Sequence, residues 1–199
     1  MASTHSTDLR ERLFQVALGH VRRQGYAHAS ISEITLEAQV AKGTFFNYFP
    51  TKYHLLSEVL HRWIEQSMAD VDAGFAGTEA VLAFSRSLAS RLSGDRKVGE
   101  AVVIHLSEVP GVQVSDLGGA VRAEDRMRDW IEARLTEALP VAVPLVEVRP
   151  PLLAFVLTCV FRGTLDEWVR GRQEARALDL AVADRMSYVL RASGLPATQ

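Results

Sequence analysis

The chain of 199 residues is 48% hydrophobic and 23% charged, so it can bury a core as one compact body or two small ones, which excludes a disordered tail. Its formal net charge of −2 excludes a protein that is basic over its whole surface, so any nucleic-acid binding needs a local patch. The single cysteine excludes an internal disulfide and a thiolate zinc cluster, and no segment suits a signal peptide or a membrane span, so we expect a soluble cytoplasmic protein.

Helical spacing of apolar residues begins near the start of the chain. Apolar residues recur at intervals of three and four over 9–21, which predicts an amphipathic first helix. Asp8 and Glu11 are spaced as a capping pair at its start, and Gly25 is expected to end it. A second, short helix is predicted to open at the capping box Ser-Ile-Ser-Glu over 30–33.

The same spacing continues through the rest of the chain. A turn at 39–41 precedes a third helix predicted at 42–48. Pro50 then breaks the chain, and Thr51 is expected to cap a long helix from Lys52 to about Phe75. Further helices are predicted at 78–93, 96–109, 120–139, 152–170 and 178–192, with breaks at Gly94, at 110–111, in the proline-rich stretch 140–151 and at Gly171.

This series of helices, without an alternating strand pattern or an internal repeat, predicts an all-α fold. The charge is divided unevenly along it. Residues 1–55 carry six Lys or Arg against four Asp or Glu, whereas residues 56–199 carry more acidic than basic side chains. The first part is therefore mildly basic, which favours the local patch that nucleic-acid binding would need.

The two short helices and the turn between them predict a helix-turn-helix unit, whose second helix enters the major groove of DNA. Lys42 and Lys52 stand at the starts of two successive helices, where positive charge suits phosphate. Thr44 and Asn47 share one helix face and can hydrogen-bond to base edges. The predicted DNA contacts are Ser30, Lys42, Gly43, Thr44, Asn47, Tyr48, Thr51 and Lys52.

Residues 30–56 closely resemble the N-terminal DNA-binding region of TetR-family transcriptional regulators. They read SISEITLEAQVAKGTFFNYFPTKYHLL. The motifs that match are Lys-Gly-Thr at 42–44, Tyr-Phe at 48–49 and Thr-Lys at 51–52. The resemblance implies a DNA-binding transcriptional regulator, most simply a repressor.

The resemblance also implies an architecture and a set of partners. Residues 1–55 would form a three-helix helix-turn-helix DNA-binding domain, and residues 56–199 a helical ligand-binding and dimerisation domain. Helices 152–170 and 178–192 would join two copies into a homodimer that binds a palindromic double-stranded DNA operator. A small-molecule effector of unknown identity would swing the long helix from Lys52, change the separation of the two DNA-reading units and release the operator.

Four residues depart from the family pattern, and the first of them is Thr35, which stands where a small alanine is usual. Gln39 stands where glycine is usual. Either its backbone is left-handed, which costs roughly 1 kcal/mol, or the turn differs from that of the family. Ala41 stands where a serine or threonine often caps the next helix, and Phe46 where a tyrosine often reaches phosphate. Phe45 and Phe49, by contrast, are four apart and are expected to anchor the short helix in the core.

The sequence identifies the ligand pocket only loosely. The candidate lining residues are Phe84, His105, Met127, Trp130, Phe155, Cys159 and Arg162, although plain core packing explains an aromatic stripe equally simply. Cys159 is expected to be a buried, inert thiol, because it lies in the most apolar predicted helix. Arg162 and Asp166 are spaced as an intrahelical pair, and pocket or dimer contacts are the alternatives.

No motif predicts an enzyme, a cofactor or a metal centre. Glu58 and His61 are half of a di-iron pattern that has no second half in the sequence, so a solvated helix face is expected there. Two other functions are carried as alternatives. One is a helical small-molecule enzyme or carrier with a vestigial DNA-binding motif, and the other is a DNA-bound adaptor that recruits another protein.

Overall fold

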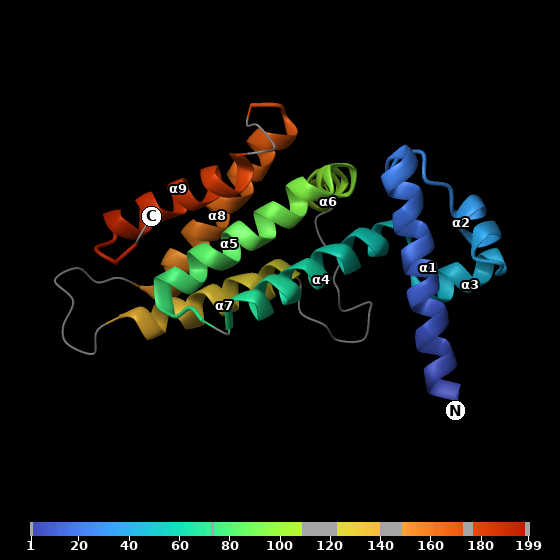
Figure 1. Ribbon diagram of the computed structural model, residues 1–199, viewed down its shortest axis with the longest axis horizontal. Coiled ribbons are helices and arrows are strands. Elements are labelled where there is room, and N and C mark those ends of the chain that lie inside the picture. Colours follow the sequence, from blue (N-terminus) through green and yellow to red (C-terminus); the bar gives the residue numbers. More distant parts are fainter. Residues whose placement is uncertain (1, 73, 109–122, 140–148, 173–176, 198–199) are drawn as a thin grey trace. The chain divides into compact units, whose positions relative to one another are not determined.

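The described parts of the chain, residues 2–72, 74–108, 123–139, 149–172 and 177–197, form helices and no strands in a computed structural model (Figure 1). The all-α prediction is therefore confirmed. The helices are α1 (Ala2–Gln24), α2 (Ile31–Glu37), α3 (Lys42–Tyr48), α4 (Lys52–Asp72), α5 (Gly77–Gly94), α6 (Arg96–Glu108), α7 (Ala123–Ala138), α8 (Pro150–Val169) and α9 (Leu178–Ala192).

Two predicted helix starts are wrong. α1 begins at Ala2, so Asp8 lies inside the helix and does not cap it. α8 begins on Pro150 and Pro151, which the sequence reading had assigned to a break. Proline suits the first turn of a helix because its missing N–H has no acceptor there. The predicted breaks at 110–111 and 140–148 lie outside the described residues.

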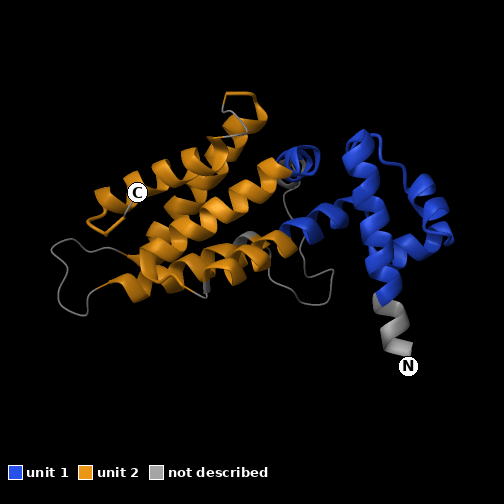
Figure 2. Cartoon of the chain, viewed as in Figure 1, with its two compact units in different colours: residues 1–60, 95–109 blue, residues 61–94, 110–199 orange. Residues whose placement is uncertain are grey.

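The chain divides into two compact units (Figure 2). Unit 1 comprises residues 1–60 and 95–109, and unit 2 comprises residues 61–94 and 110–199. α4 contributes its first half to unit 1 and its second half to unit 2, and α6 belongs to unit 1. The boundary predicted between residues 55 and 56 remains a prediction about which part folds independently.

The core of unit 1 is built on two aromatic rings. Phe45 of α3 and Phe49 after it are fully buried, with ring centroids 5.5 Å apart, and Phe14 of α1 lies 6.4 Å from Phe49. The expectation that Phe45 and Phe49 form core is confirmed. Phe46 meets Phe45 edge-on but is 41% exposed. These contacts fix one face of α3 inward and leave the opposite face toward solvent.

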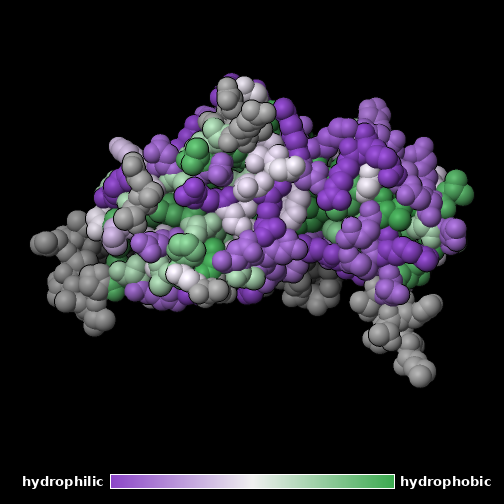
Figure 3. Space-filling model, viewed as in Figure 1, coloured by the Kyte–Doolittle hydropathy of each residue, from purple (hydrophilic) through white to green (hydrophobic). Residues whose placement is uncertain are grey.

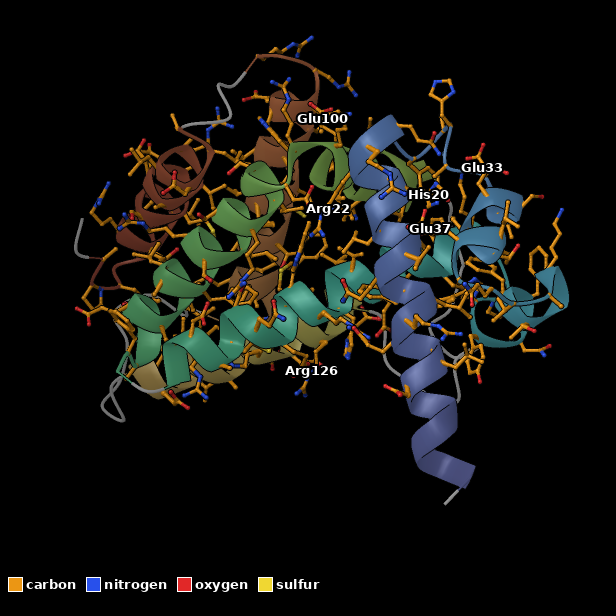
Figure 4. All side chains as sticks on the ribbon, turned by 45° about the vertical axis from the view of Figure 1, so that its right-hand side comes forward. His20, Arg22, Glu33, Glu37, Glu100 and Arg126 are labelled. Atoms are coloured by element: carbon orange, nitrogen blue, oxygen red, sulfur yellow. The ribbon has the colours of Figure 1, made fainter. Side chains whose placement is uncertain are left out.

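Polar side chains join α1 to α2 in a way that the sequence reading missed. Ser30 occupies the N-cap position of α2 but makes no side-chain cap hydrogen bond, so the predicted capping box is wrong. Glu33 instead accepts a hydrogen bond from Gln24 of α1 at 3.1 Å. Nearby, Nε2 of the buried His20 lies 2.9 Å from Oε2 of Glu37 (Figure 4). α2 is thus held by the last turns of α1 and not by a local cap.

Gln39 has a left-handed backbone, with φ of 53°, in the turn between α2 and α3. We expect Gln39→Gly to raise the free energy of unfolding by about 0.5–1 kcal/mol, because relief of the left-handed strain outweighs the added freedom of the unfolded chain. Urea unfolding measures the change. Gln15→Gly, in the right-handed backbone of α1, is the matched control and should have the opposite sign. Destabilisation by both substitutions would contradict the prediction.

Unit 2 packs α5 against α7 and α9, while α8 contacts α7 and α9. Fully buried side chains from α5 and α7, among them Phe84, Leu88 and Ile131, fill the interior. Arg91 of α5 pairs with Asp70 of α4 at 2.6 Å, and hydrogen bonds from Ser87 and Arg91 lower the pKa of the Asp70 carboxyl. None of the helices in the described parts of the chain has the length and apolar character of a membrane span.

Candidate nucleic-acid interface and helical body

The solvent face of α3 is polar. With Phe45 buried, Lys42, Gly43 and Asn47 are exposed and Thr44 and Tyr48 are half-buried. Short side chains such as threonine and asparagine can reach base edges, and asparagine can pair with adenine through two hydrogen bonds. As expected, Ala41 at the N-cap gives no side-chain hydrogen bond to this helix. Five of the residues predicted to contact DNA therefore lie on α3, three of them exposed and two half-buried.

Thr51 precedes α4, and both its hydroxyl and its amide bond to the side chain of His54. The hydroxyl of Thr51 lies 2.8 Å from Nδ1 of His54, and the amide of Thr51 donates to the same nitrogen at 3.2 Å. His54 is buried and so takes the place that glutamate has in a capping box. Thr51 thus stabilises the start of the helix that carries Lys52. Ser30, also a predicted DNA contact, is half-buried at the start of α2.

The ammonium group of Lys52 is bound within the protein. Its Nζ donates to the backbone carbonyl of Tyr26 and, at 3.0 Å, to that of Ala29. It also lies 4.3 Å from the centroid of the Tyr26 ring, within cation–π range. Burial lowers the pKa of Lys52 from its ordinary value. Lys42 and Lys52, which the sequence presented as equivalents, therefore differ in their surroundings.

Most cations of unit 1 have a partner in the protein. Arg10 binds Glu58 through two hydrogen bonds of 3.2 and 2.8 Å, and Arg22 and Arg23 bind Asp95 and Glu37. Among the described lysines and arginines of this unit, Arg12 and Lys42 are the ones without an acidic or carbonyl partner. Two cationic side chains are thus left to bind a phosphate, Arg12 on α1 and Lys42 on α3.

Tyr26, beside Lys52, makes the free energy of unfolding of unit 1 depend on pH in the alkaline range. Burial raises the pKa of its hydroxyl to about 12, with a smaller contribution from Tyr53. Because the folded-state pKa lies above the unfolded value of about 10, this stabilisation is complete below pH 10 and is lost as pH rises through about 12. We expect Tyr26→Phe to remove that loss in urea unfolding across this interval. Tyr188→Phe is the control, because Tyr188 lies in unit 2 and its substitution leaves unit 1 unchanged. Equal pH dependence in wild type and Tyr26→Phe would refute the assignment.

The predicted ligand-binding residues of unit 2 fall into two groups, whereas His105 of α6 belongs to unit 1. Phe84 of α5 is buried with its ring centroid 4.9 Å from that of Trp130 in α7, and Met127 is buried one turn earlier in α7. Phe155, Cys159 and Arg162 are instead exposed on α8, and the side chain of His105 lies outside the description. The expectation of a buried Cys159 is therefore wrong. Asp166, which was predicted to pair with Arg162, binds Arg170 at 2.9 Å.

Large apolar side chains are exposed on the last two helices, and we call this set the α8–α9 surface. On α8, Leu152, Phe155 and Cys159 follow one another at intervals of three and four and so share a face. On α9, Leu180 and Tyr188 are exposed. The sequence predicted that these two helices form the dimer interface but did not identify Leu180 or Tyr188. Their spacing of eight residues, which places them on one side of the helix, could have identified them. Figure 3 shows hydrophobic residues reaching the surface over unit 2 among hydrophilic ones.

A groove of about 500 Å³ lies between α8 and α9 beside Tyr188. Arg185 crosses from α9 to α8, where it donates to Glu167 at 2.6 Å and to Thr164 at 3.1 Å. The groove therefore combines apolar walls with an ion pair that is already satisfied.

The pattern of Glu58 and His61 has a structural explanation. Glu58 accepts both hydrogen bonds from Arg10, which also lies over the ring of Phe49. Among the described side chains there is no group of three His, Cys, Asp or Glu residues placed to hold a metal ion. The carboxylate at position 58 therefore joins α4 to α1.

Comparisons with known proteins agree with this geometry. Residues 13–59 match the family of bacterial regulatory proteins, tetR family. An uncharacterised HTH-type transcriptional regulator of Mycobacterium tuberculosis is 26% identical over 179 residues, covering 90% of this chain and 77% of the relative. The HTH-type repressor KstR of Mycolicibacterium smegmatis is 33% identical over 78 residues, covering 39% of this chain and 38% of KstR.

Solved structures extend the likeness of fold to both units. The TetR-family repressor FadR of Thermus thermophilus, in complex with lauroyl-CoA, has a TM-score of 0.74 at 20% identity, covering 91% of this chain and 93% of that one. FadR of Bacillus subtilis, in complex with stearoyl-CoA, has a TM-score of 0.68 at 19% identity, covering 88% and 96%. These relatives are regulators of transcription, not enzymes.

Proposed function

Since residues 13–59 match the tetR family of bacterial regulatory proteins, we propose that the chain is a TetR-family regulator, a homodimeric repressor that leaves its DNA operator when a small molecule binds to unit 2. The observation that carries the proposal is the exposed polar face of α3, which Phe45 and Phe49 hold away from the core. A DNA-reading helix requires such a face. A repressor acts on the chromosome, so its place would be the bacterial cytoplasm.

The proposal gives a task to each residue of α3 that is predicted to contact DNA. Lys42 contacts phosphate, Thr44 and Asn47 read base edges, and Tyr48 donates its hydroxyl to the backbone. Gly43 permits close approach of α3 to the DNA. Ser30 and Thr51 lie just before α2 and α4, the helices that flank α3 in the sequence, and would add backbone contacts there. Lys52 acts on the same interface by a different route, described below.

The α8–α9 surface would join two copies. Its exposed apolar side chains, Leu152, Phe155, Leu180 and Tyr188, would be covered in a dimer, as the core of a stable interface requires. A dimer has two α3 helices, and these can occupy successive major grooves on one face of the duplex when they stand roughly 34–36 Å apart. Dimer formation is therefore what would turn weak single contacts into operator affinity.

The effector site would include the interior contact of Phe84, Met127 and Trp130. The rings of Phe84 and Trp130 meet between α5 and α7, Met127 is buried one turn before Trp130, and an apolar site of this kind accommodates an alkyl or aromatic group. Acyl-CoA is the first ligand class to test, because the FadR structures of Thermus thermophilus and Bacillus subtilis hold lauroyl-CoA and stearoyl-CoA. By linkage, an effector that weakens DNA binding must itself bind less tightly to the DNA complex.

Selection of bound duplexes from a random pool, with and without lauroyl-CoA and other metabolites, tests the proposal. The purified chain is expected to enrich a palindrome and to lose it when an effector is present. No enriched sequence at low ionic strength would overturn the proposal. Catalytic turnover of the added metabolites without DNA selection would instead favour the enzyme alternative, and selection without any effector response would favour the adaptor.

Asn47→Ala is expected to relax base preference at one position in each half-site, at about 1–3 kcal/mol per position. The reason is that asparagine makes paired hydrogen bonds to a base that alanine cannot make. Duplex selection with the variant measures the change. Gln15→Ala, on the exposed side of α1, is the matched control and should select the parental site. If both variants returned the same site, Asn47 would not read bases.

A further inference from the structure

We propose that Lys52 is a positioning residue, which closes the helix-turn-helix segment on itself, and that its ammonium group does not serve as a phosphate contact. The inference rests on the proposed DNA-binding function. It assigns to Lys52 a role different from that of Lys42, although the sequence places both lysines at helix starts.

The acceptors of Lys52 lie in the turn between α1 and α2. Gly25 ends α1 with φ of +83°, and the amide of Ala29 donates back to the carbonyl of Gly25 at 3.1 Å. The carbonyls of Tyr26 and Ala29 both accept from Nζ of Lys52, while the Tyr26 ring lies against the same ammonium group. Two of the three N–H donors of Lys52 are thus committed to the backbone, in a partly buried site.

These two bonds close a ring around α2 and α3. Ala29 is the residue before the N-cap of α2, and Lys52 is the first residue of α4. The bond from Lys52 to Ala29 therefore joins the two ends of the segment 30–51, which contains both helices of the helix-turn-helix. Since α3 lies inside this ring, its position relative to α1 depends on the tie as well as on the core contacts of Phe45.

Salt dependence distinguishes a tie from a phosphate contact. A lysine that neutralises a phosphate releases counterions, so its loss reduces the slope of log affinity against log salt by about 0.9 per contact. A lysine that holds the protein in shape changes affinity without changing that slope. Lys42, exposed and without a partner among the described residues, is the matched comparison on the neighbouring helix.

The test compares Lys52→Met with Lys42→Met on the selected operator over a range of salt. We expect Lys52→Met to lower affinity by about tenfold with an unchanged slope, and Lys42→Met to reduce the slope by about 0.9 in each half-site. Lys52→Arg, which can reach the same carbonyls, should recover most of the affinity. A slope reduction in Lys52→Met equal to that in Lys42→Met would overturn the proposal.

Hydrogen exchange without DNA provides a second readout. We expect the amides of residues 26–30 to exchange faster in Lys52→Met and at the wild-type rate in Lys42→Met, and unchanged exchange in both would also overturn the proposal. If Lys52→Met does not fold, Tyr26→Ala replaces it, because this variant weakens the tie and alters no charge. Failure of the wild type to select any duplex would refute the proposed function alone, since hydrogen exchange still reports on the tie.

Discussion

Phe155→Glu is expected to separate the homodimer and to lower operator affinity on the order of 10²–10⁴-fold. Phe155 is 53% exposed in the single chain and lies on one face of α8 with Leu152 and Cys159, at the centre of the surface that we propose joins two copies. Glutamate there would bring two symmetry-related carboxylates into an apolar interface, where burial of an unpaired charge is strongly unfavourable. A monomer binds only one half-site, so it loses the affinity that a dimer gains by binding both half-sites at once.

Sedimentation of the free protein and titration of the selected operator measure the two consequences separately. Phe75→Glu is the control for an added exposed carboxylate, because Phe75 is 50% exposed between α4 and α5 and belongs to neither α8 nor α9. It should leave both the mass and the affinity unchanged. A Phe155→Glu variant that sediments as a dimer with parental affinity would show that α8 is not the interface.

Phe45→Ala is expected to destabilise unit 1 by about 3–5 kcal/mol, the range for removing a fully buried aromatic side chain. Its ring contacts Phe49 at 5.5 Å between centroids, and Phe49 in turn contacts Phe14 of α1. The cavity would therefore open at the point where α3 is attached to the rest of unit 1. Operator binding should be lost along with the fold of α3.

The adjacent Phe46 supplies the control for this prediction. Its side chain is partly exposed and touches Phe45 only at the ring edge, so Phe46→Ala should be destabilising by less than about 1 kcal/mol. Urea unfolding followed by circular dichroism distinguishes the two variants. Equal losses of unfolding free energy in the two variants would mean that Phe45 does not anchor α3. Another contact would then have to orient its polar face.

Sequence periodicity predicted the helices best where local signals agree. α3 and α9 begin and end where they were predicted, because a break lies at both ends of each. The left-handed backbone at Gln39 follows from the family pattern, in which glycine occupies that position. The buried pair Phe45 and Phe49 follows from spacing alone. In each case the determining residues lie within a few positions of one another.

Contacts between residues that are far apart in the sequence could not be predicted from it. The hydrogen bonds of Lys52 go to carbonyls more than twenty residues away, and backbone acceptors leave no mark in the side-chain pattern. The division of the predicted ligand-binding residues into a buried and an exposed group was also not predictable from the sequence. Phe155 and Trp130 read alike as aromatic residues of a helix, and only packing reveals that one faces solvent and the other approaches Phe84.

The junction between α1 and α6 has a consequence for how such a regulator can change over evolution. Asp95 binds Arg22 at 2.6 Å, and Lys97 donates to the carbonyl of Arg23 at 2.7 Å, so the segment that opens α6 is fastened to the end of α1. Neither Asp95 nor Lys97 lies on the face of α3 or among the interior aromatic residues. Under the proposed function, substitutions at this junction would leave unchanged both the residues that read DNA and those proposed to bind the effector.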